Sequence, residues 1–184
     1  YKNGQGIAPD LKEAAQWLRK AADQGHAGAQ FNLGIMYTNG QGVARDGKEA
    51  LKWHLKAAEQ GNLGAQANLG VMYMEGQGVA PDPKISVSWH RKAAEQGLAR
   101  AQFNLGVIYK NGQGVALNLK EAAQWFRKAA DQGVAAAQYN LGLMYDNGQG
   151  VPQDYAEAVK WYFKAAEQGN AQAGRYLKQQ SFGK

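Results

Sequence analysis

Asp82, Ser86 and His90 carry the side-chain types of a hydrolytic triad at i, i+4 and i+8 of one predicted helix. In a working triad the histidine lies between the acid and the serine, and an oxyanion hole is close by. Here the serine takes the middle position, and Asp82 is expected to be the N-cap of the helix. His54 and His90 hold equivalent places in successive segments, but two imidazoles without a third ligand make a weak metal site. We therefore predict no catalytic residue, no metal, no cofactor and no enzymatic activity.

Glycine-rich loops could cradle a phosphate, but their number argues against that role. The sequence reads NGQG at 3–6, 39–42, 111–114 and 147–150, and EGQG at 75–78. A phosphate loop is needed once, between a strand and a helix, and no strand pattern precedes these segments. We interpret them as turns between helices, in which glycine provides the positive φ that ends a helix.

A unit of 36 residues accounts for nearly the whole chain. Five tryptophans keep this interval without an insertion: Trp17, Trp53, Trp89, Trp125 and Trp161. A fixed period of roughly 20–50 residues is typical of stacked repeat proteins. We predict a single domain over residues 1–184 that ends in a polar capping helix. Its five repeats would be 1–36, 37–72, 73–108, 109–144 and 145–180.

Each unit is predicted to form two helices. The second begins at a good N-cap, and in four units a glutamate three residues later could complete a capping box. The N-caps are Asp10, Asp46, Asp82, Asn118 and Asp154. A turn of two or three residues, such as that around Gly25, leads to the next helix, so neighbouring helices must be antiparallel.

Glycines recur inside the first helix of the units, where each costs about 1 kcal/mol relative to alanine. They are Gly34, Gly70, Gly106 and Gly142. A helix retains glycine where another element approaches too closely for a side chain. We expect the bulky Trp and Tyr residues of neighbouring helices to fill this space.

The repeat resembles the Sel-1-like repeat, a relative of the tetratricopeptide repeat, in the pattern A-x-A-Q-x-N-L-G-x-M-Y-x-N-G-Q-G-V-x-x-D-x-x-E-A-x-x-W-x-x-K-A-A-E-Q-G. The resemblance covers essentially the whole chain. It implies an all-α, right-handed solenoid of about ten helices in antiparallel pairs, with a concave groove used as a protein scaffold or adaptor. Relatives with paired cysteines are a poor guide, because this chain has no cysteine. The resemblance suggests a bacterial origin and leaves secreted, periplasmic and cytoplasmic locations open.

Resemblance to tetratricopeptide arrays implies that the first helix of each unit lines the groove, and that an asparagine in the N-L-G motif binds peptide backbone. The matching residues are Asn32, Asn68, Asn104 and Asn140. An asparagine amide both donates and accepts, so it can pair with any peptide unit. Alternatively, these amides bond between adjacent helices and fix the superhelix. The sequence leaves both interpretations open.

The residues around these asparagines vary between units, as a recognition surface requires. Arg100 is expected between Asn68 and Asn104, with Lys110 beyond it, in a cluster that could hold a carboxylate from a C-terminus or an acidic side chain. The expected aromatic anchors are Phe31, Phe103 and Tyr139. Taken singly, each could instead be an ordinary exposed or gap-filling side chain.

A row of lysines near the end of the second helices offers an alternative function. It comprises Lys20, Lys56, Lys92, Lys128 and Lys164. Each can complement the helix dipole and pair with an acid three residues on. On a convex surface the row could instead bind RNA or another polyanion. The net charge of +6 is moderate, and the groove positions that read bases in RNA-binding repeats are largely Gly, Ala, Ile and Val. Nucleic acid therefore ranks second.

No apolar run is long enough to cross a bilayer, and no signal peptide is visible. Tyr1 corresponds to the end of a first helix, so we expect the array to begin upstream. Trp17 should then expose apolar surface that could support end-to-end self-association.

Overall fold

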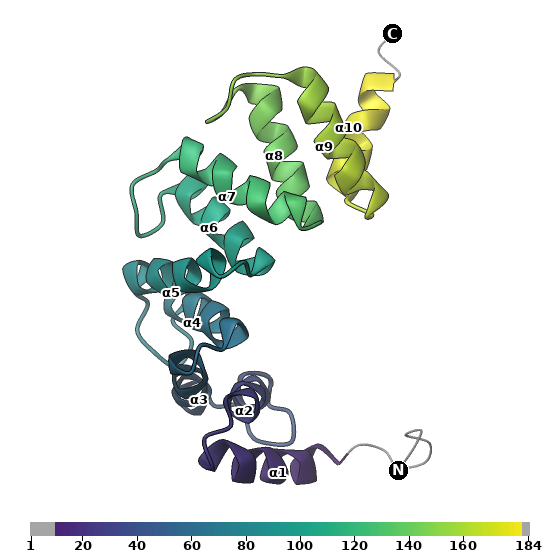
Figure 1. The fold of residues 1–184 in the computed structure, drawn as a ribbon. Coiled ribbons are helices and arrows are strands. Elements are labelled where there is room, and N and C mark those ends of the chain that lie inside the picture. The colour runs from purple at the N-terminus through teal and green to yellow at the C-terminus, as the bar shows by residue number, and fades with distance from the viewer. Residues whose placement is uncertain (1–9, 182–184) are drawn as a thin grey trace. The chain divides into compact units, whose positions relative to one another are not determined.

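The structure is a computed structural model that describes the backbone of residues 10–181 and the side chains of residues 10–179. Between residues 10 and 181 it contains ten helices and no strand (Figure 1). The chain is an all-α solenoid of antiparallel helix pairs, as predicted. It divides into two compact units, Tyr1–Asp82 and Pro83–Lys184. The first predicted turn, at residues 3–6, lies outside the described residues.

The first unit contains four helices, and each packs against the next one in the sequence. They are α1 (Leu11–Asp23), α2 (Ala27–Asn39), α3 (Gly47–Glu59) and α4 (Leu63–Glu75). Trp53 is only 1% exposed and packs in a core with Leu33 and Tyr37 of α2 and Met72 of α4. Trp17, in contrast, is 60% exposed, as predicted. Self-association through it remains a prediction.

The second unit contains six helices arranged in the same way (Figure 1). They are α5 (Pro83–Glu95), α6 (Ala99–Asn111), α7 (Leu119–Asp131), α8 (Ala135–Asn147), α9 (Tyr155–Glu167) and α10 (Ala171–Ser181). Pro83 is the first residue of α5, as expected from its fixed φ and missing N–H. Ala158, Tyr162 and Ala165 of α9 form a core with Ala173 of α10.

The predicted N-cap of α3 is confirmed, but the predicted capping box is wrong. Asp46 Oδ1 accepts hydrogen bonds from the backbone N–H groups of Lys48 and Glu49, at 2.9 and 3.1 Å. The backbone N–H of Asp46 already donates to the carbonyl of Tyr37 at 3.0 Å. Because that donor is satisfied, Glu49 is available for another contact, and its Oε2 accepts from Trp53 Nε1 at 3.1 Å.

The loops between first and second helices are turns, as predicted. Gly40 is the C-cap of α2 with φ 70°, and Gly42 has the same φ. An L-residue with a side chain rarely adopts this left-handed conformation, so glycine is the favoured residue at these positions.

Three interior glycines lie against the residue that follows a tryptophan, so the expectation that tryptophan fills this space is wrong for these three. A Cβ atom would approach the facing ring closely in three pairs: Gly34 and His54 at 2.7 Å, Gly106 and Phe126 at 2.5 Å, and Gly142 and Tyr162 at 2.8 Å. The expected tyrosine is found only in the last pair. Adjacent helical residues point about 100° apart. Trp53 faces Arg19 of α1, so His54, the next residue, faces α2 instead.

Buried glutamines connect three consecutive helices, a feature that the sequence analysis did not identify. Gln102 of α6 donates to the Ala94 carbonyl of α5 at 3.1 Å. Its Oε1 accepts from Nε2 of Gln132, just after α7, at 2.7 Å. Gln138 repeats this arrangement with Ala130 and Gln168, and Gln30 repeats it with Ala22 and Gln60. These amides satisfy buried polar groups and hold neighbouring helices in register.

Candidate functional site

In the second unit, the first helices of adjacent repeats meet through residues 30 positions apart. Lys110, in the last turn of α6, donates from Nζ to Asn140 Oδ1 of α8 at 3.1 Å. Asn140 Nδ2 in turn donates to the Ala136 carbonyl at 2.8 Å. Lys110 is half-buried, and no carboxylate of the described residues lies within ion-pair distance of it. The structure therefore brings these two predicted site residues together and leaves the ammonium without a counter-charge.

The next pair of first helices carries a different contact at the same positions. Asp146 of α8 accepts from the hydroxyl groups of Tyr176 and Tyr162, at 3.0 and 3.3 Å. Burial and the Asp146 carboxylate raise the pKa of Tyr176 to about 12 and raise that of Tyr162 further. Both hydroxyl groups therefore remain protonated donors at neutral pH.

The predicted aromatic anchors of the second unit are half-buried. The ring of Phe103 lies 5.9 Å from that of Phe126, and Tyr139 lies 5.7 Å from Tyr162, both in tilted arrangements. Such aromatic pairs are favourable contacts. Each anchor therefore fills space between its helix and the next one, while part of the ring stays accessible.

Arg100 and Lys110 lie at opposite ends of α6. Ten residues at 1.5 Å per residue place their backbones about 15 Å apart along the helix, so the two cations project from different turns, and the shared carboxylate site stays a prediction. Arg100 is exposed, and its positive charge acts on His90 of α5. Asn104, between them, is half-buried and forms no hydrogen bond with the described residues.

In the first unit, the predicted residues Phe31 and Asn68 surround His54. The rings of Phe31 and His54 lie 5.8 Å apart. Asn68 Nδ2 is 3.4 Å from His54 Nε2. Asn32 is exposed. His54 therefore occupies a packing position, as expected for a residue that is replaced by Phe126 and Tyr162 in later repeats.

Neither the triad residues nor the metal-ligand residue types are arranged for those roles among residues 10–179. Ser86 and His90 are buried, at 0% and 2% exposed, so a substrate has no access to them. No three His, Cys, Asp or Glu side chains in this range gather into a metal site. None of the helices between residues 10 and 181 is both long enough and apolar enough to span a membrane.

The recurring lysines lie over the tryptophan three residues earlier in the same helix. The distances from Nζ to the ring centroid are 4.1 Å for Lys20, 4.6 Å for Lys56, 4.3 Å for Lys92, 4.1 Å for Lys128 and 4.3 Å for Lys164. Cation–π attraction of this kind is worth about 0.5–1 kcal/mol at an exposed site. Within residues 10–179, none of these lysines forms the expected ion pair with the acid three residues on.

Stacked helical hairpins, regular capping and a surface that varies between repeats define a helical-repeat protein. The Sel1 repeat family model matches residues 1–26, 27–62, 64–98, 99–134 and 135–170. The chain therefore belongs to the Sel1 repeat family, as its sequence pattern suggested. Sel1 repeats generally act as protein-interaction scaffolds and are typically non-catalytic.

Solved structures of bacterial relatives share the fold. A Sel1 repeat protein from Oxalobacter formigenes is 43% identical with a TM-score of 0.87, over 97% of this chain and 52% of that one. The c5321 protective antigen of uropathogenic Escherichia coli is 42% identical with a TM-score of 0.91, over 98% of this chain and 39% of that one. Helicobacter pylori cysteine rich protein B is 25% identical with a TM-score of 0.58, over 72% of this chain and 95% of that one.

The chain thus spans about half, or less, of the length of the first two relatives. No curated protein matches it.

Proposed function

We propose that the chain binds a protein partner along its first helices, and that Lys110 on α6 anchors a carboxylate of that partner. The contact between Lys110 Nζ and Asn140 Oδ1 carries this proposal. An ammonium group has three donors, and only one is used here. Asn140 holds the group in place, so little side-chain freedom is lost when a ligand binds.

The surroundings of Lys110 suit a peptide better than a small anion. Phe103 and Tyr139 present the accessible parts of rings that Phe126 and Tyr162 already hold in place. Rigid aromatic anchors of this kind often dominate binding energy at protein interfaces. The free amide of Asn104 can pair with the backbone of an extended peptide.

A display library of random heptapeptides with free C-termini tests the proposal. The tightest selected peptide should bind Lys110→Met at least about tenfold more weakly, since a hydrogen bond to a charged group is worth about 1.5–3 kcal/mol. Methionine is a suitable replacement because Met74 holds the equivalent position one repeat earlier. Lys160→Met removes the same charge from the exposed surface of α9 and should leave affinity unchanged.

Equal weakening by both substitutions would contradict the proposal, because it would indicate general attraction to positive charge. The same conclusion would follow if binding vanished between 50 and 200 mM salt (roughly the range over which multi-phosphate contacts weaken steeply). That result would favour the polyanion alternative.

A further inference from the structure

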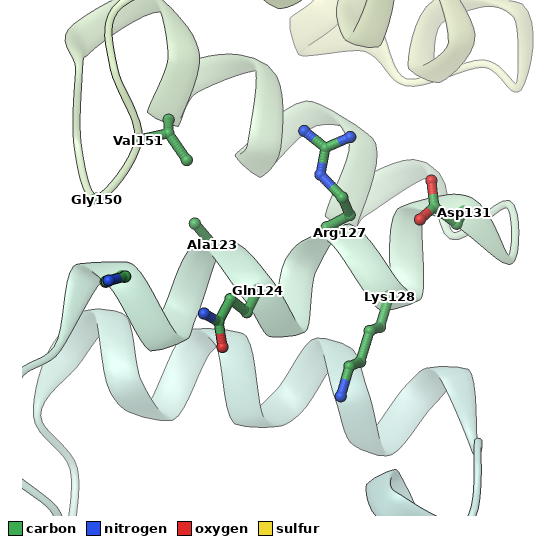
Figure 2. Close-up of a pocket in the computed structure, with 8 residues that line it drawn as sticks. Ala123, Gln124, Arg127, Lys128, Asp131, Gly150 and Val151 are labelled. Carbon is green, nitrogen blue, oxygen red and sulfur yellow. The ribbon is translucent and has the colours of Figure 1, made fainter.

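A second kind of site recurs on the second helices, and nothing in the proposed function uses it. In the second unit, a pocket of about 500 Å³ lies between α7 and the loop before α9 (Figure 2). It is lined by three cations, Lys120, Arg127 and Lys128, by one carboxylate, Asp131, and by Ala123, Gln124, Gly150 and Val151. In the first unit, a pocket of about 270 Å³ is lined by the counterparts of six of these residues, three repeats earlier: Lys12, Ala15, Gln16, Arg19, Gly42 and Val43.

The centre of the pocket in the second unit is apolar, with positive charge beside it. Figure 2 shows the side chains of Ala123 and Val151 directed towards each other across it, with the Arg127 guanidinium on the same side of α7. Lys120 is seven residues before Arg127 and therefore lies on the same face of the helix, about 10 Å away. A ligand on Ala123 and Val151 would thus lie between two cations.

Arg127 has neutral partners only. It donates from Nη2 to the hydroxyl group of Tyr145, and its guanidinium carbon lies 5.4 Å from the ring centroid of Trp161. None of the described carboxylates lies within ion-pair distance of it. Arg19 has the same surroundings in the first unit, with Tyr37 and Trp53. A guanidinium has five donors in a planar fork, so each arginine is fixed in position with donors available for an anion.

The second repeat shows the same fold without these features. There, Leu51 and Leu55 stand where the pockets have alanine and arginine. Leu51 packs against the core of the first unit. The second repeat therefore keeps its helices with large apolar residues at both positions.

We propose that these two pockets bind acidic peptide segments, in which a glutamate or aspartate carboxylate contacts the arginine and lysine and an adjacent apolar side chain occupies the space between alanine and valine. Bidentate pairing suits arginine and carboxylate. RNA is disfavoured because single-stranded binders stack bases on aromatic faces. Here Lys128 covers the ring of Trp125, while Arg127 and Lys164 lie over Trp161.

The experiment follows the methyl NMR signals of Val43 and Val151 in the 184-residue chain. The probe is the peptide acetyl-Glu-Val-Glu-Val-Glu-amide, and its Gln-Val-Gln-Val-Gln counterpart is the control for charge. The glutamate peptide should shift both signals saturably, and the glutamine peptide should not. Polyuridylate, added separately, should leave both signals in place.

Two variants test the lining directly. The double variant Ala15→Leu, Ala123→Leu fills both pockets with the residue found at position 51. Its affinity for the glutamate peptide should be at least tenfold lower. The double variant Arg19→Leu, Arg127→Leu introduces the residue found at position 55 and should lower this affinity at least tenfold as well. The spectrum and thermal melting of each variant establish that it is folded. Lys164→Ala, the matched control, removes a cation of the lysine row outside the pockets and should change affinity less than twofold.

Unchanged binding in the folded leucine variants would overturn the proposal. The proposal would also be overturned if polyuridylate shifted both valine signals and if this shift were lost in Lys164→Ala. That result would assign the surface to nucleic acid. Lys110→Met should not alter binding of the glutamate peptide, so this proposal and the proposed function can fail independently.

Discussion

Replacing His90 by phenylalanine should remove part of the acid sensitivity of the fold. His90 is 2% exposed in α5, and its Nδ1 has no hydrogen-bond partner among residues 10–179. Burial, with a smaller contribution from the positive charge of Arg100, lowers its pKa from 6.5 to about 4. Phe126, the equivalent residue one repeat later, is fully buried, so this position accommodates a phenyl ring.

The sign and size of the effect follow from proton linkage. Above pH 6.5 the imidazole is neutral in the folded and the unfolded chain, so it causes no pH dependence. Between pH 6.5 and about 4, the unfolded chain takes up a proton that the folded chain does not, and the free energy of unfolding decreases. At about 1.4 kcal/mol per pKa unit, the loss approaches about 3 kcal/mol. Below pH 4 it levels off, because the folded chain is protonated too.

Urea unfolding of the wild type and of His90→Phe between pH 4 and 8, followed by circular dichroism, measures this difference. As the pH falls from 7.5 to 4, the free energy of unfolding of the variant should rise by about 3 kcal/mol relative to that of the wild type. His26→Phe, at an exposed histidine, is the control for removing an imidazole elsewhere in the chain. An NMR titration of His90 with a midpoint near 6.5, or a wild-type-to-variant difference independent of pH, would refute the reasoning.

Two further predictions concern packing. In Gly142→Ala the new Cβ would lie 2.8 Å from the Tyr162 ring, so unfolding should become about 1–3 kcal/mol easier in urea. Gly174→Ala places its new Cβ with nothing within 4 Å and should instead stabilise α10 by up to about 1 kcal/mol. A loss of stability in both variants would contradict the close contact between Gly142 and Tyr162. Gln102→Leu should cost about 0.5–1.5 kcal/mol by the same assay, because it removes the side-chain hydrogen bond to the Ala94 carbonyl, which still accepts from the Gly97 N–H. An unchanged urea midpoint would show that the glutamine contacts contribute nothing.

The helices and their ends could be predicted because local chemistry determines them. Asp46 needs only the two N–H groups that follow it to act as an N-cap. Gly40 needs only a left-handed conformation to end α2. Both signals recur every 36 residues, so a single interpretation applied to all repeats.

The contacts between helices could not be predicted in the same way. Trp53 and His54 are adjacent and both have large rings, and the rotation of α3 about its axis decides which of them faces Gly34. Both positions recur every 36 residues, although only the tryptophan is invariant, so the spacing alone does not decide which of them faces the glycine. The same rotation places Glu49 Oε2 where it accepts a hydrogen bond from Trp53 Nε1.

The sequence indicated which residues belong to the candidate site, but not the contacts that they make. Asn140 and Lys110 were both expected to face a ligand, but their mutual hydrogen bond spans 30 residues and depends on how α6 packs against α8. Arg100 and Lys110 were grouped because both are cations at positions that vary. Their separation along a single helix follows from helix geometry alone, so the sequence already contained the information needed to separate them.

The pockets on the second helices show how binding properties can change while the fold is kept. The contacts that hold adjacent helices together involve the interior glycines, the buried glutamines and the N-caps. The pocket residues Ala123 and Arg127 belong to none of these sets, and their counterparts Leu51 and Leu55 occur in a repeat with the same helices. Substitution at two positions per repeat can therefore add or remove such a pocket while the glycine, glutamine and N-cap contacts are kept, at the loss of the arginine contacts with Tyr145 and Trp161. It follows that the number of pockets, and with it the avidity for a repetitive acidic partner, can vary independently of the number of repeats.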